Sequence, residues 1–289
     1  LVAEGIRAVP VYRQLAQKTF VTTRSGVLAK RGTLQKAATL LCGHGYADQY
    51  VDRFTTGAAE EGDLLGDDTV PEVALVGTSN SDPAYNFAGF ISEALGVEVL
   101  NESLTGGGFD GPLFRYLPTE GFQKAPPKLL IWELQTYHNM SDPSFYRTAV
   151  PLVTDGCRRK PAVLSRSVRV KGASAEALFN GGGQVRELKG KNYLLDIQFD
   201  DPSVKKLKAI VWYTDGGKEN LSLENSPRIE AKGRFVTELR SDSGWGERTF
   251  LSLDIQRPDN TPTGVGVKAT LCGRDTAAPA RQRLVSASR

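Results

Sequence analysis

The sequence is poor in the residues that build metal sites, and it has no long apolar run. It contains 2 histidines, 3 cysteines and 1 methionine in 289 residues. These histidines and cysteines show no metal-ligand spacing, so we expect no metal and no other cofactor. No stretch approaches the roughly 18 consecutive apolar residues of a membrane-spanning helix, so the sequence predicts no membrane span.

Two further sequence motifs are missing. A run of three glycines, Gly106–Gly108, lacks the lysine and the spacing of a phosphate-binding loop. No signal peptide is visible, and the chain begins with Leu1 rather than an initiator methionine. We therefore expect that the true start of the protein lies upstream of Leu1 or has been removed.

The remaining composition is that of an ordinary globular protein, with 40% hydrophobic and 24% charged residues. The charge is divided unevenly, because residues 1–150 carry a net charge of −5 and residues 151–289 one of +8. A basic half beside an acidic half suggests that one part attracts a polyanion. A chance imbalance on a solvated surface is the alternative.

The number of cysteines is odd. Cys157 and Cys272 stand near the two ends of the basic half. In an oxidising compartment one disulfide between them would join the termini of a single domain, whereas in cytosol two buried thiols are the default. Cys42 then has no partner in this chain, so it is either a free buried thiol or the partner of a cysteine in a segment that the chain lacks.

The first half of the chain alternates strand and helix signals. Its predicted elements are a helix at 1–17 interrupted near Pro10, a buried strand at 72–77, a helix at 87–95 that ends at Gly96, and strands at 97–100 and 128–134. This alternation predicts an α/β domain with a parallel sheet. Its functional residues should lie at the carboxyl ends of the strands.

The second half reads as a series of strands separated by turns. The predicted strands are 165–171, 192–199, 207–213, 233–240, 249–255 and 264–272. This spacing predicts an all-β sandwich. We therefore expect two domains, residues 1–150 and residues 151–289, with the boundary at Pro151–Cys157.

The turn Gly77-Thr78-Ser79-Asn80-Ser81 follows the first buried strand and opens toward a helix. This geometry lifts the Ser79 hydroxyl to the carboxyl edge of the sheet and points backbone N–H groups at an oxyanion formed beside it. Such turns also cap helices for purely structural reasons. A nucleophilic serine needs a base, usually a histidine oriented by a carboxylate, and neither His44 nor His138 has an adjacent acid.

Three segments carry a pattern found in a known family. They are Val73–Ser81 with Tyr85-Asn86-Phe87, Glu102–Gly108, and Leu130–Leu134. Together they resemble the SGNH-hydrolase-like alginate O-acetyltransferases, although the usual Gly-x-Asn-Asp signature of SGNH enzymes is not seen. The resemblance spans essentially the whole chain. It implies an SGNH-hydrolase-like domain, incomplete at its N-terminus, followed by a β-sandwich carbohydrate-binding module.

The resemblance implies that Ser79 is the nucleophile that takes up and passes on an acetyl group. In this family the catalytic Asp-x-His motif precedes the nucleophile and lies just before a helix that resembles residues 1–17. The motif is absent here, so we expect the chain to be the C-terminal portion of a longer protein. The missing segment would also hold the disulfide partner of Cys42.

The resemblance extends to other residues of the site. Tyr85 and Tyr137 match family positions at the mouth of the site, where a phenol could donate a hydrogen bond to an acetyl oxygen or a sugar hydroxyl. Aromatic packing at a strand edge is the alternative for both. One of Gly106, Gly107 and Gly108 would bring a backbone N–H to the oxyanion.

In the second half, Lys208, Trp212 and Lys218 look like family positions on the sugar-binding face. Lysine ammonium groups pair with uronate carboxylates, and an indole stacks on a pyranose ring. Ile210 shares a strand face with Lys208 and Trp212, so core packing of Trp212 is an equal alternative.

The function implied by the resemblance is O-acetyl transfer to mannuronate hydroxyls of alginate during exopolysaccharide biosynthesis. The partners would be the polymannuronate chain, a protein or membrane-linked acetyl donor, and other alginate-export proteins of the periplasm, with no nucleic acid. Lys205, Lys206 and Arg234 could extend a basic groove for the polymer or be solvated. A non-catalytic polysaccharide-binding scaffold and a secreted carbohydrate esterase are the alternatives.

Overall fold

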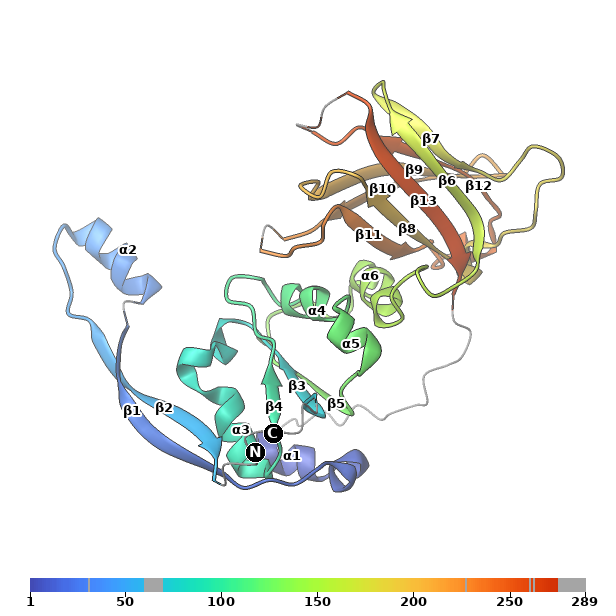
Figure 1. Ribbon diagram of the computed structural model, residues 1–289. Helices are drawn as coiled ribbons and strands as arrows, with labels where there is room; N and C mark the ends of the chain where they lie inside the picture. Colours follow the sequence, from blue (N-terminus) through green and yellow to red (C-terminus); the bar gives the residue numbers. More distant parts are fainter. Residues whose placement is uncertain (31, 60–69, 227, 260, 262, 275–289) are drawn as a thin grey trace. The chain divides into compact units, whose positions relative to one another are not determined.

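The computed structural model describes residues 1–30, 32–59, 70–226, 228–259, 261 and 263–274 (Figure 1). The chain folds into two compact units. The first contains Leu1–Pro112 and Ala125–Gln135, and the second contains Leu113–Lys124 and the described residues from Thr136 onward. Among the described residues, none of the helices has the length and apolar character needed to cross a membrane.

A three-stranded parallel sheet forms the centre of the first unit. Its strands β3 (Val73–Val76), β4 (Val99–Asn101) and β5 (Leu129–Trp132) lie in the order β4-β3-β5. All four residues of β3 are fully buried, which confirms the buried strand expected at 72–77. The carboxyl end of this central strand lies at one edge of the sheet, between the ends of β4 and β5.

Two helices pack against the sheet through apolar side chains. α1 (Val2–Arg7) contributes Ile6, and α3 (Phe87–Leu95) contributes Ile91 and Leu95, to a core shared with β3. A 3-10 turn at Pro10–Gln14 follows α1, at the place where Pro10 was expected to interrupt the helix. Gly96 ends α3 in the left-handed conformation, which a glycine adopts without steric cost.

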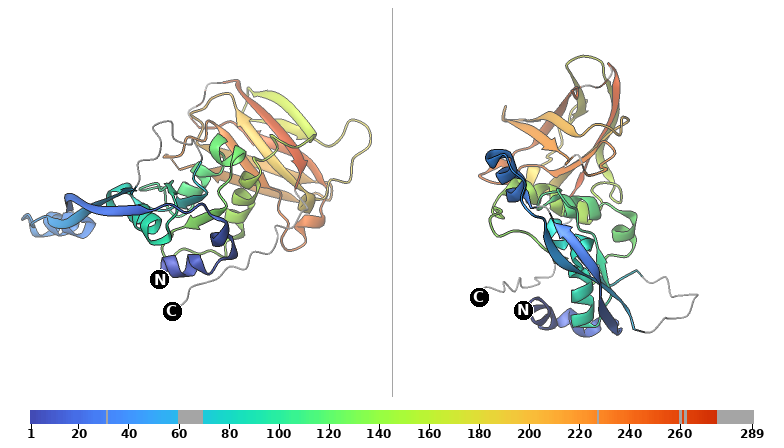
Figure 2. Two further views of the ribbon diagram at one scale, coloured as in Figure 1. Left: turned by 60° about the horizontal axis from the view of Figure 1, so that its bottom comes forward. Right: turned by 90° about the vertical axis from the view of Figure 1, so that its left-hand side faces the viewer.

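The sequence patterns did not predict the long ribbon that also belongs to the first unit. β1 (Phe20–Lys30) and β2 (Gln49–Ala58) pair antiparallel, and α2 (Thr33–Cys42) lies between them in sequence. Figures 1 and 2 show the ribbon extending away from the parallel sheet with α2 at its far end. Leu34, Leu40 and Leu41 of α2 are more than four-fifths exposed.

The second unit contains a β-sandwich, as the sequence predicted. One antiparallel sheet has the strand order β10-β9-β12-β7 and the other has the order β11-β8-β13-β6, with an apolar core drawn from both sheets. The strands are β6 (Ala162–Val170), β7 (Ser174–Phe179), β8 (Tyr193–Phe199), β9 (Lys206–Tyr213), β10 (Lys218–Glu224), β11 (Arg234–Glu238), β12 (Phe250–Gln256) and β13 (Val265–Gly273). Strands β7 and β10 were not among those predicted.

Short helices complete the second unit. They are α4 (Gly111–Tyr116), which begins at the boundary of the units, α5 (Glu120–Lys124) and α6 (Pro143–Val153), with 3-10 turns at Gly190–Asn192 and Trp245–Glu247. α6 packs against β11, and Arg147 of α6 forms an ion pair with Glu219 at 2.7 Å. The boundary expected at Pro151–Cys157 therefore falls inside a compact unit, because α6 is bound to the sandwich.

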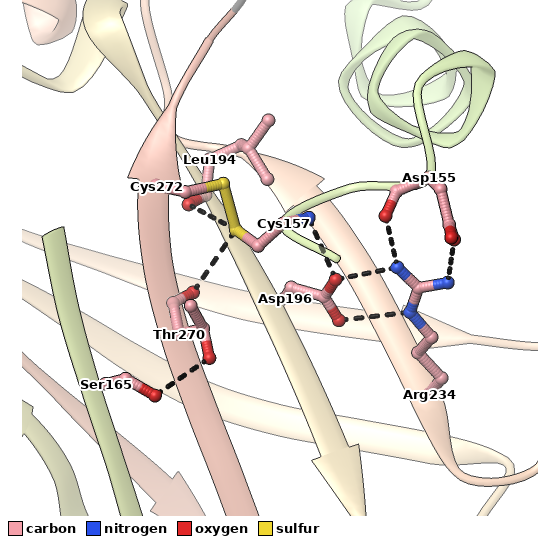
Figure 3. Close-up of a disulfide and its surroundings, with 8 residues drawn as sticks. All are labelled: Asp155, Cys157, Ser165, Leu194, Asp196, Arg234, Thr270 and Cys272. Carbon is pink, nitrogen blue, oxygen red and sulfur yellow. Dashed lines mark hydrogen bonds and ion pairs between the residues drawn. A yellow bond between two sulfur atoms is a disulfide. The ribbon is translucent and has the colours of Figure 1, made fainter. Parts of the chain in front are cut away.

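The disulfide between Cys157 and Cys272 is present and joins the segment after α6 to the last strand of the sandwich (Figure 3). Beside it Arg234 is buried between Asp155 and Asp196, with nitrogen–oxygen distances of 2.6 and 2.7 Å. The solvated role considered for Arg234 is therefore wrong, because its side chain is buried. Its guanidinium is a structural ion-pair partner in the same region as the disulfide.

Candidate active site

Ser79 lies where strand β3 gives way to a 3-10 turn at Ser79–Ser81. The residues before it, Gly77 and Thr78, are buried, whereas Ser79 itself is exposed. Its hydroxyl and its backbone N–H form no hydrogen bond within the described part of the chain. The turn thus presents a serine with both polar hydrogens available at the carboxyl edge of the sheet, where the sequence placed it.

The turn around Ser79 is held by the carboxylate of Glu133, which follows β5. The Glu133 Oε2 atom accepts hydrogen bonds from the Thr78 N–H at 2.7 Å and the Thr78 hydroxyl at 2.9 Å. It also accepts one from the Ser81 hydroxyl at 3.1 Å. The second oxygen, Oε1, accepts a hydrogen bond from the Asn80 side-chain amide at 3.3 Å. In the sequence, Glu133 stood only within the family segment Leu130–Leu134, and no role was predicted for it.

Gly77 is required by the close packing of this network. A Cβ atom on Gly77 would lie 2.4 Å from the Ser81 Oγ and 3.0 Å from Oε2 of Glu133. The first distance is well below van der Waals contact, so a larger residue would displace the Ser81 side chain. The glycine before the turn thus allows the carboxylate and the turn to approach each other.

The glycine loop after β4 is attached to the same turn. The Leu104 N–H donates a hydrogen bond to the Gly77 carbonyl at 2.9 Å, and the Thr105 hydroxyl donates one to Asp82 at 2.6 Å. The Thr105 hydroxyl, the Ala84 N–H and the charge of Lys30 together lower the pKa of Asp82 below its ordinary value. An ionised Asp82 therefore joins the serine turn to the loop.

The three glycines differ in what their N–H groups can do. The Gly107 N–H donates a hydrogen bond to the Leu104 carbonyl at 3.0 Å, so it is already engaged. The N–H groups of Gly106 and Gly108 have no partner among the residues that the structure describes. Both of these glycines are left-handed, with φ of 76° and 74°. They are the chemically available donors of the loop.

The two tyrosines have different surroundings. Tyr85 ends the 3-10 turn Pro83–Tyr85 that follows Asp82, and the Lys30 ammonium lies 4.4 Å from its ring centroid. Tyr85 thus belongs to the first unit with Ser79. Tyr137 lies in the second unit, is 78% exposed, and has its ring tilted against that of His138, with ring centroids 4.5 Å apart. It is therefore not one of the residues that the first unit gathers around Ser79.

The histidines do not complete a catalytic triad in the first unit. His44 is exposed in the loop after α2, where its ring lies 4.7 Å from that of Tyr46. His138 belongs to the second unit. Over the described ranges, no group of three or more histidine, cysteine, aspartate or glutamate side chains could hold a metal ion.

The proposed sugar-binding residues lie on the outer face of the sheet β10-β9-β12-β7. On β9 the buried residues are Leu207, Ala209, Val211 and Tyr213, so the alternate positions point away from the core. Trp212 is therefore not a core residue, so the core-packing alternative is wrong, and its sugar-binding role stays a prediction.

Polar contacts hold the indole of Trp212 in place on this face. Its Nε1–H donates a hydrogen bond to Asp254 at 2.8 Å, and the Lys218 ammonium lies 5.9 Å from the ring centroid. Lys208 is half exposed and lies 3.8 Å from Asp259. One aromatic plane and two lysines thus share one solvent-facing surface, which is suited to an acidic sugar chain.

Comparison with known proteins identifies relatives for both units. A family model described as an SGNH hydrolase-like domain, acetyltransferase AlgX, matches residues 1–136, and one described as a C-terminal carbohydrate-binding module matches residues 156–284. The chain is 46% identical over 284 residues to the alginate biosynthesis protein AlgX of Pseudomonas aeruginosa, with 97% of this chain and 59% of that protein covered.

Two further comparisons extend this result. Over 72 residues, 25% of this chain and 18% of the relative, the chain is 46% identical to the probable alginate O-acetylase AlgJ of P. aeruginosa. A solved structure of P. aeruginosa AlgX matches with a TM-score of 0.83 and 45% identity, covering 94% of this chain and 63% of that one. The chain spans about three fifths of the length of the curated AlgX relatives that it matches.

Proposed function

Because this chain belongs to the AlgX/AlgJ family of alginate biosynthesis proteins, we propose that it is part of an O-acetyltransferase acting on mannuronate hydroxyls of alginate. The observation that carries the proposal is the exposed Ser79 at the carboxyl end of β3, with its hydroxyl and N–H both unpaired within the described residues. A serine in this position is suited to covalent acyl transfer.

The reaction takes place in two steps at Ser79. First, the Ser79 oxygen attacks the carbonyl carbon of a donor acetyl group, a base takes the hydroxyl proton, and the bond to the donor's leaving group breaks as that group receives the proton. Then a mannuronate hydroxyl loses its proton to the base and attacks the acetyl-serine carbonyl carbon, and the bond to the Ser79 oxygen breaks as the base returns the proton to that oxygen. The tetrahedral oxyanion in each step accepts hydrogen bonds from the Ser79 N–H and from Gly106 or Gly108.

The base in this proposal is a histidine paired with an aspartate from a part of the protein outside residues 1–289. In support, the chain spans about three fifths of its relatives, and the Ser79 hydroxyl has no described partner. Cys42 is free and exposed at the end of α2, beside the exposed leucines of that helix. We assign its disulfide partner, and the cover of this helix, to the same additional segment.

The sandwich serves in this proposal to hold the polymer. Lys208 and Lys218 pair with uronate carboxylates, and Trp212 stacks on a sugar ring. Tyr137 and Tyr85 stay candidates for hydrogen bonds to the acetyl group or the acceptor sugar. Holding the acceptor beside the acetyl-serine favours the sugar hydroxyl over water, because the effective concentration of a bound reactant is very high.

The proposed compartment is the periplasm, because a disulfide such as Cys157–Cys272 forms and persists in oxidising compartments. The proposal adds an acetyl donor, either a protein or a membrane-linked group, and other proteins of alginate export as partners. The match to a carbohydrate-binding module supports a second candidate function, a polysaccharide-binding scaffold without catalysis.

The test compares the full-length protein with its Ser79→Ala variant on a chromogenic acetate ester, with and without mannuronate oligomers. We expect the variant to lose about 1,000-fold or more in rate. We also expect acetylated oligomer to form only with the intact serine. Free acetate without acetylated sugar would indicate an esterase. Oligomer binding without any turnover would indicate the scaffold.

A further inference from the structure

The polar hydrogens of the turn that carries Ser79 are almost all engaged. The Thr78 N–H is bound to Glu133, the Asn80 N–H to the Thr78 hydroxyl, and the Ser81 N–H to the Thr78 carbonyl. The side chains of Thr78, Asn80 and Ser81 also donate to Glu133. Within the described residues, the backbone N–H and the hydroxyl groups of residues 78–81 are therefore all paired except those of Ser79.

Strand register explains why one carboxylate reaches so many donors. β5 pairs in parallel with β3, with Trp132 opposite Val76, and the Glu133 N–H donates a hydrogen bond to the Val76 carbonyl at 2.9 Å. Glu133, the residue directly after β5, thus lies beside the start of the turn. Gln135, two residues further on, donates a hydrogen bond to the Thr78 hydroxyl at 3.1 Å and completes the network.

We propose that Glu133 is a positioning residue for acyl transfer: its carboxylate binds the neighbouring donors and so leaves the N–H and hydroxyl of Ser79 as the groups that face the acyl carbon. This inference rests on the proposed function of Ser79. An acyl oxygen meeting this turn finds one backbone donor, at the nucleophile itself. Glu133 fixes that donor and the Ser79 oxygen in one geometry before substrate binds.

The positioning role of Glu133 requires its negative charge. Four donors converge on its two oxygens, and a carboxylate offers only acceptors. A glutamine of the same shape has one oxygen and an NH2 group, which would face another donor. The neutral amide also lacks the charge that strengthens the hydrogen bonds from Thr78 and Ser81. We therefore expect the E133Q variant to displace the turn and the Ser79 oxygen with it.

A matched control lies at the opposite end of the same sheet, before the neighbouring strand β3. Glu72 precedes β3, accepts a hydrogen bond from the Ala16 N–H at 2.9 Å, and forms an ion pair with Lys128. The E72Q variant makes the same chemical change in the same sheet, away from Ser79. Comparing E133Q with E72Q therefore separates a loss at the turn from a general effect of removing a carboxylate beside β3.

The experiment measures kcat and KM of the full-length protein on an acetate ester, per folded molecule, for wild type, E133Q, E72Q and Ser79→Ala. We expect E133Q to lower kcat about 10- to 100-fold with KM within about two-fold, because small displacements of a nucleophile have effects of this size. E72Q should keep wild-type kcat. The loss in E133Q should exceed any loss of folded protein measured by thermal unfolding.

Variants of Thr78 test the route by which Glu133 acts. Thr78→Val removes the hydroxyl that Glu133 binds, and Thr78→Ser keeps it. We expect T78V to lower kcat, T78S to restore it, and the double variant E133Q/T78V to be little slower than E133Q alone, since residues in one network are not additive. Independent, multiplying losses would overturn the assignment of both residues to one network.

The outcomes distinguish this inference from the proposed function. If Ser79→Ala is inactive while E133Q keeps wild-type kcat, the positioning role is overturned and the proposed function stands. If E133Q changes only KM or only the folded fraction, the role is overturned in the same way. If Ser79→Ala retains wild-type activity, the proposed function fails and the role of Glu133 fails with it.

Discussion

At the scale of single residues, one ionised carboxylate connects the two loops of the candidate site. Asp82 lies three residues after Ser79, caps the following 3-10 turn through the Ala84 N–H, and accepts a hydrogen bond from Thr105 of the glycine loop. These contacts favour the charged form and lower its pKa. Its contribution to stability must therefore depend on pH.

The direction of this dependence follows from the lowered pKa. The folded state favours ionised Asp82 more than the unfolded chain does, so the stabilisation is present above the ordinary value of 3.8 and is lost as pH falls through the lower folded-state pKa. We expect Asp82→Asn to lower the unfolding temperature near neutral pH, with the difference from wild type shrinking toward about pH 2.

Thermal unfolding followed by circular dichroism between about pH 2 and pH 7 checks this. Asp52→Asn is the control, because the ion pair of Asp52 with Arg24 is half exposed and worth little. A difference between Asp82→Asn and wild type that stays constant over the whole range would contradict the prediction, since it would show that the charge of Asp82 is not involved.

At the scale of elements, α6 is bound to the sandwich by a partly buried ion pair. Arg147 of α6 contacts Glu219 of β10, and its guanidinium donates two hydrogen bonds to the Glu238 carbonyl of β11. Glu219 also accepts a hydrogen bond from the buried Tyr213 hydroxyl, and burial together with the charge of Glu219 raises the pKa of Tyr213. The helix and three strands, β9, β10 and β11, thus share one polar cluster.

Removing only the cation of this pair, Arg147, should lower the stability of the protein. Glu219 is 7% exposed, so Arg147→Met leaves a buried carboxylate without its counter-charge. We expect the free energy of unfolding to fall by about 2–4 kcal/mol, somewhat below the value for a fully buried pair because Arg147 is 20% exposed. The double variant Arg147→Met/Glu219→Gln should recover part of this loss.

Denaturant unfolding of the three proteins measures these differences. Recovery in the double variant is the decisive observation, because it shows that the unpaired charge, and not lost packing of the arginine stem, causes the destabilisation. A double variant less stable than Arg147→Met alone would mean that the contacts of Arg147 and Glu219 stabilise α6 independently of their charges.

At the scale of the whole molecule, the disulfide joins two positions far apart in the sequence of the second unit. Cys157 and Cys272 are 115 residues apart in sequence, with the eight strands of the sandwich between them or containing them. A bridge over so long a loop restricts the unfolded chain strongly, by about 4–5 kcal/mol in the chain-entropy model. Nearby, the buried Arg234 joins Asp155 to Asp196 and adds a second connection.

The double variant Cys157→Ser/Cys272→Ser tests the contribution of the bridge. We expect it to lower the free energy of unfolding by about 2–5 kcal/mol under oxidising conditions. With reductant present during denaturant unfolding, wild type and variant should have similar midpoints. A variant that remains much less stable than reduced wild type would show that the serines disturb the packing around the sulfur atoms.

Several elements could be predicted from the sequence because their patterns were local. β3 is a continuous apolar run, α3 has apolar residues at helical spacing and ends at a glycine, and six sandwich strands follow clear turns. β10 was not predicted, because Glu219, which faces inward on this strand, is charged. The burial of Glu219 depends on an ion pair with Arg147, which belongs to a helix distant in sequence. The β1–β2 ribbon was not predicted because most of its residues are exposed on both faces, so they show no apolar alternation.

In the candidate site too, local features could be predicted from the sequence, whereas contacts between distant segments could not. Local sequence placed Ser79 at the edge of a sheet, and the family resemblance named its neighbours. Glu133 lay near the end of the strand predicted at 128–134, at the same edge of the sheet, and that position was the signal available for finding it. Its partners, however, lie more than fifty residues earlier in the chain. No pattern within the serine turn or within the segment around Glu133 predicts that the two segments are in contact.

Residue order and side-chain type therefore sufficed for the α/β part followed by a β-sandwich and for the turn that carries Ser79, because each depends on periodicity or turn chemistry. Cysteine position offered the Cys157–Cys272 disulfide as one of two alternatives, and the structure contains it. Folding was needed to show that Trp212 faces solvent, that Arg234 is buried, that Gly107 is engaged and that Glu133 holds the serine turn. These properties depend on the pairing of distant segments. The register of neighbouring strands and the packing of side chains decide that pairing, and both exist only in the folded chain.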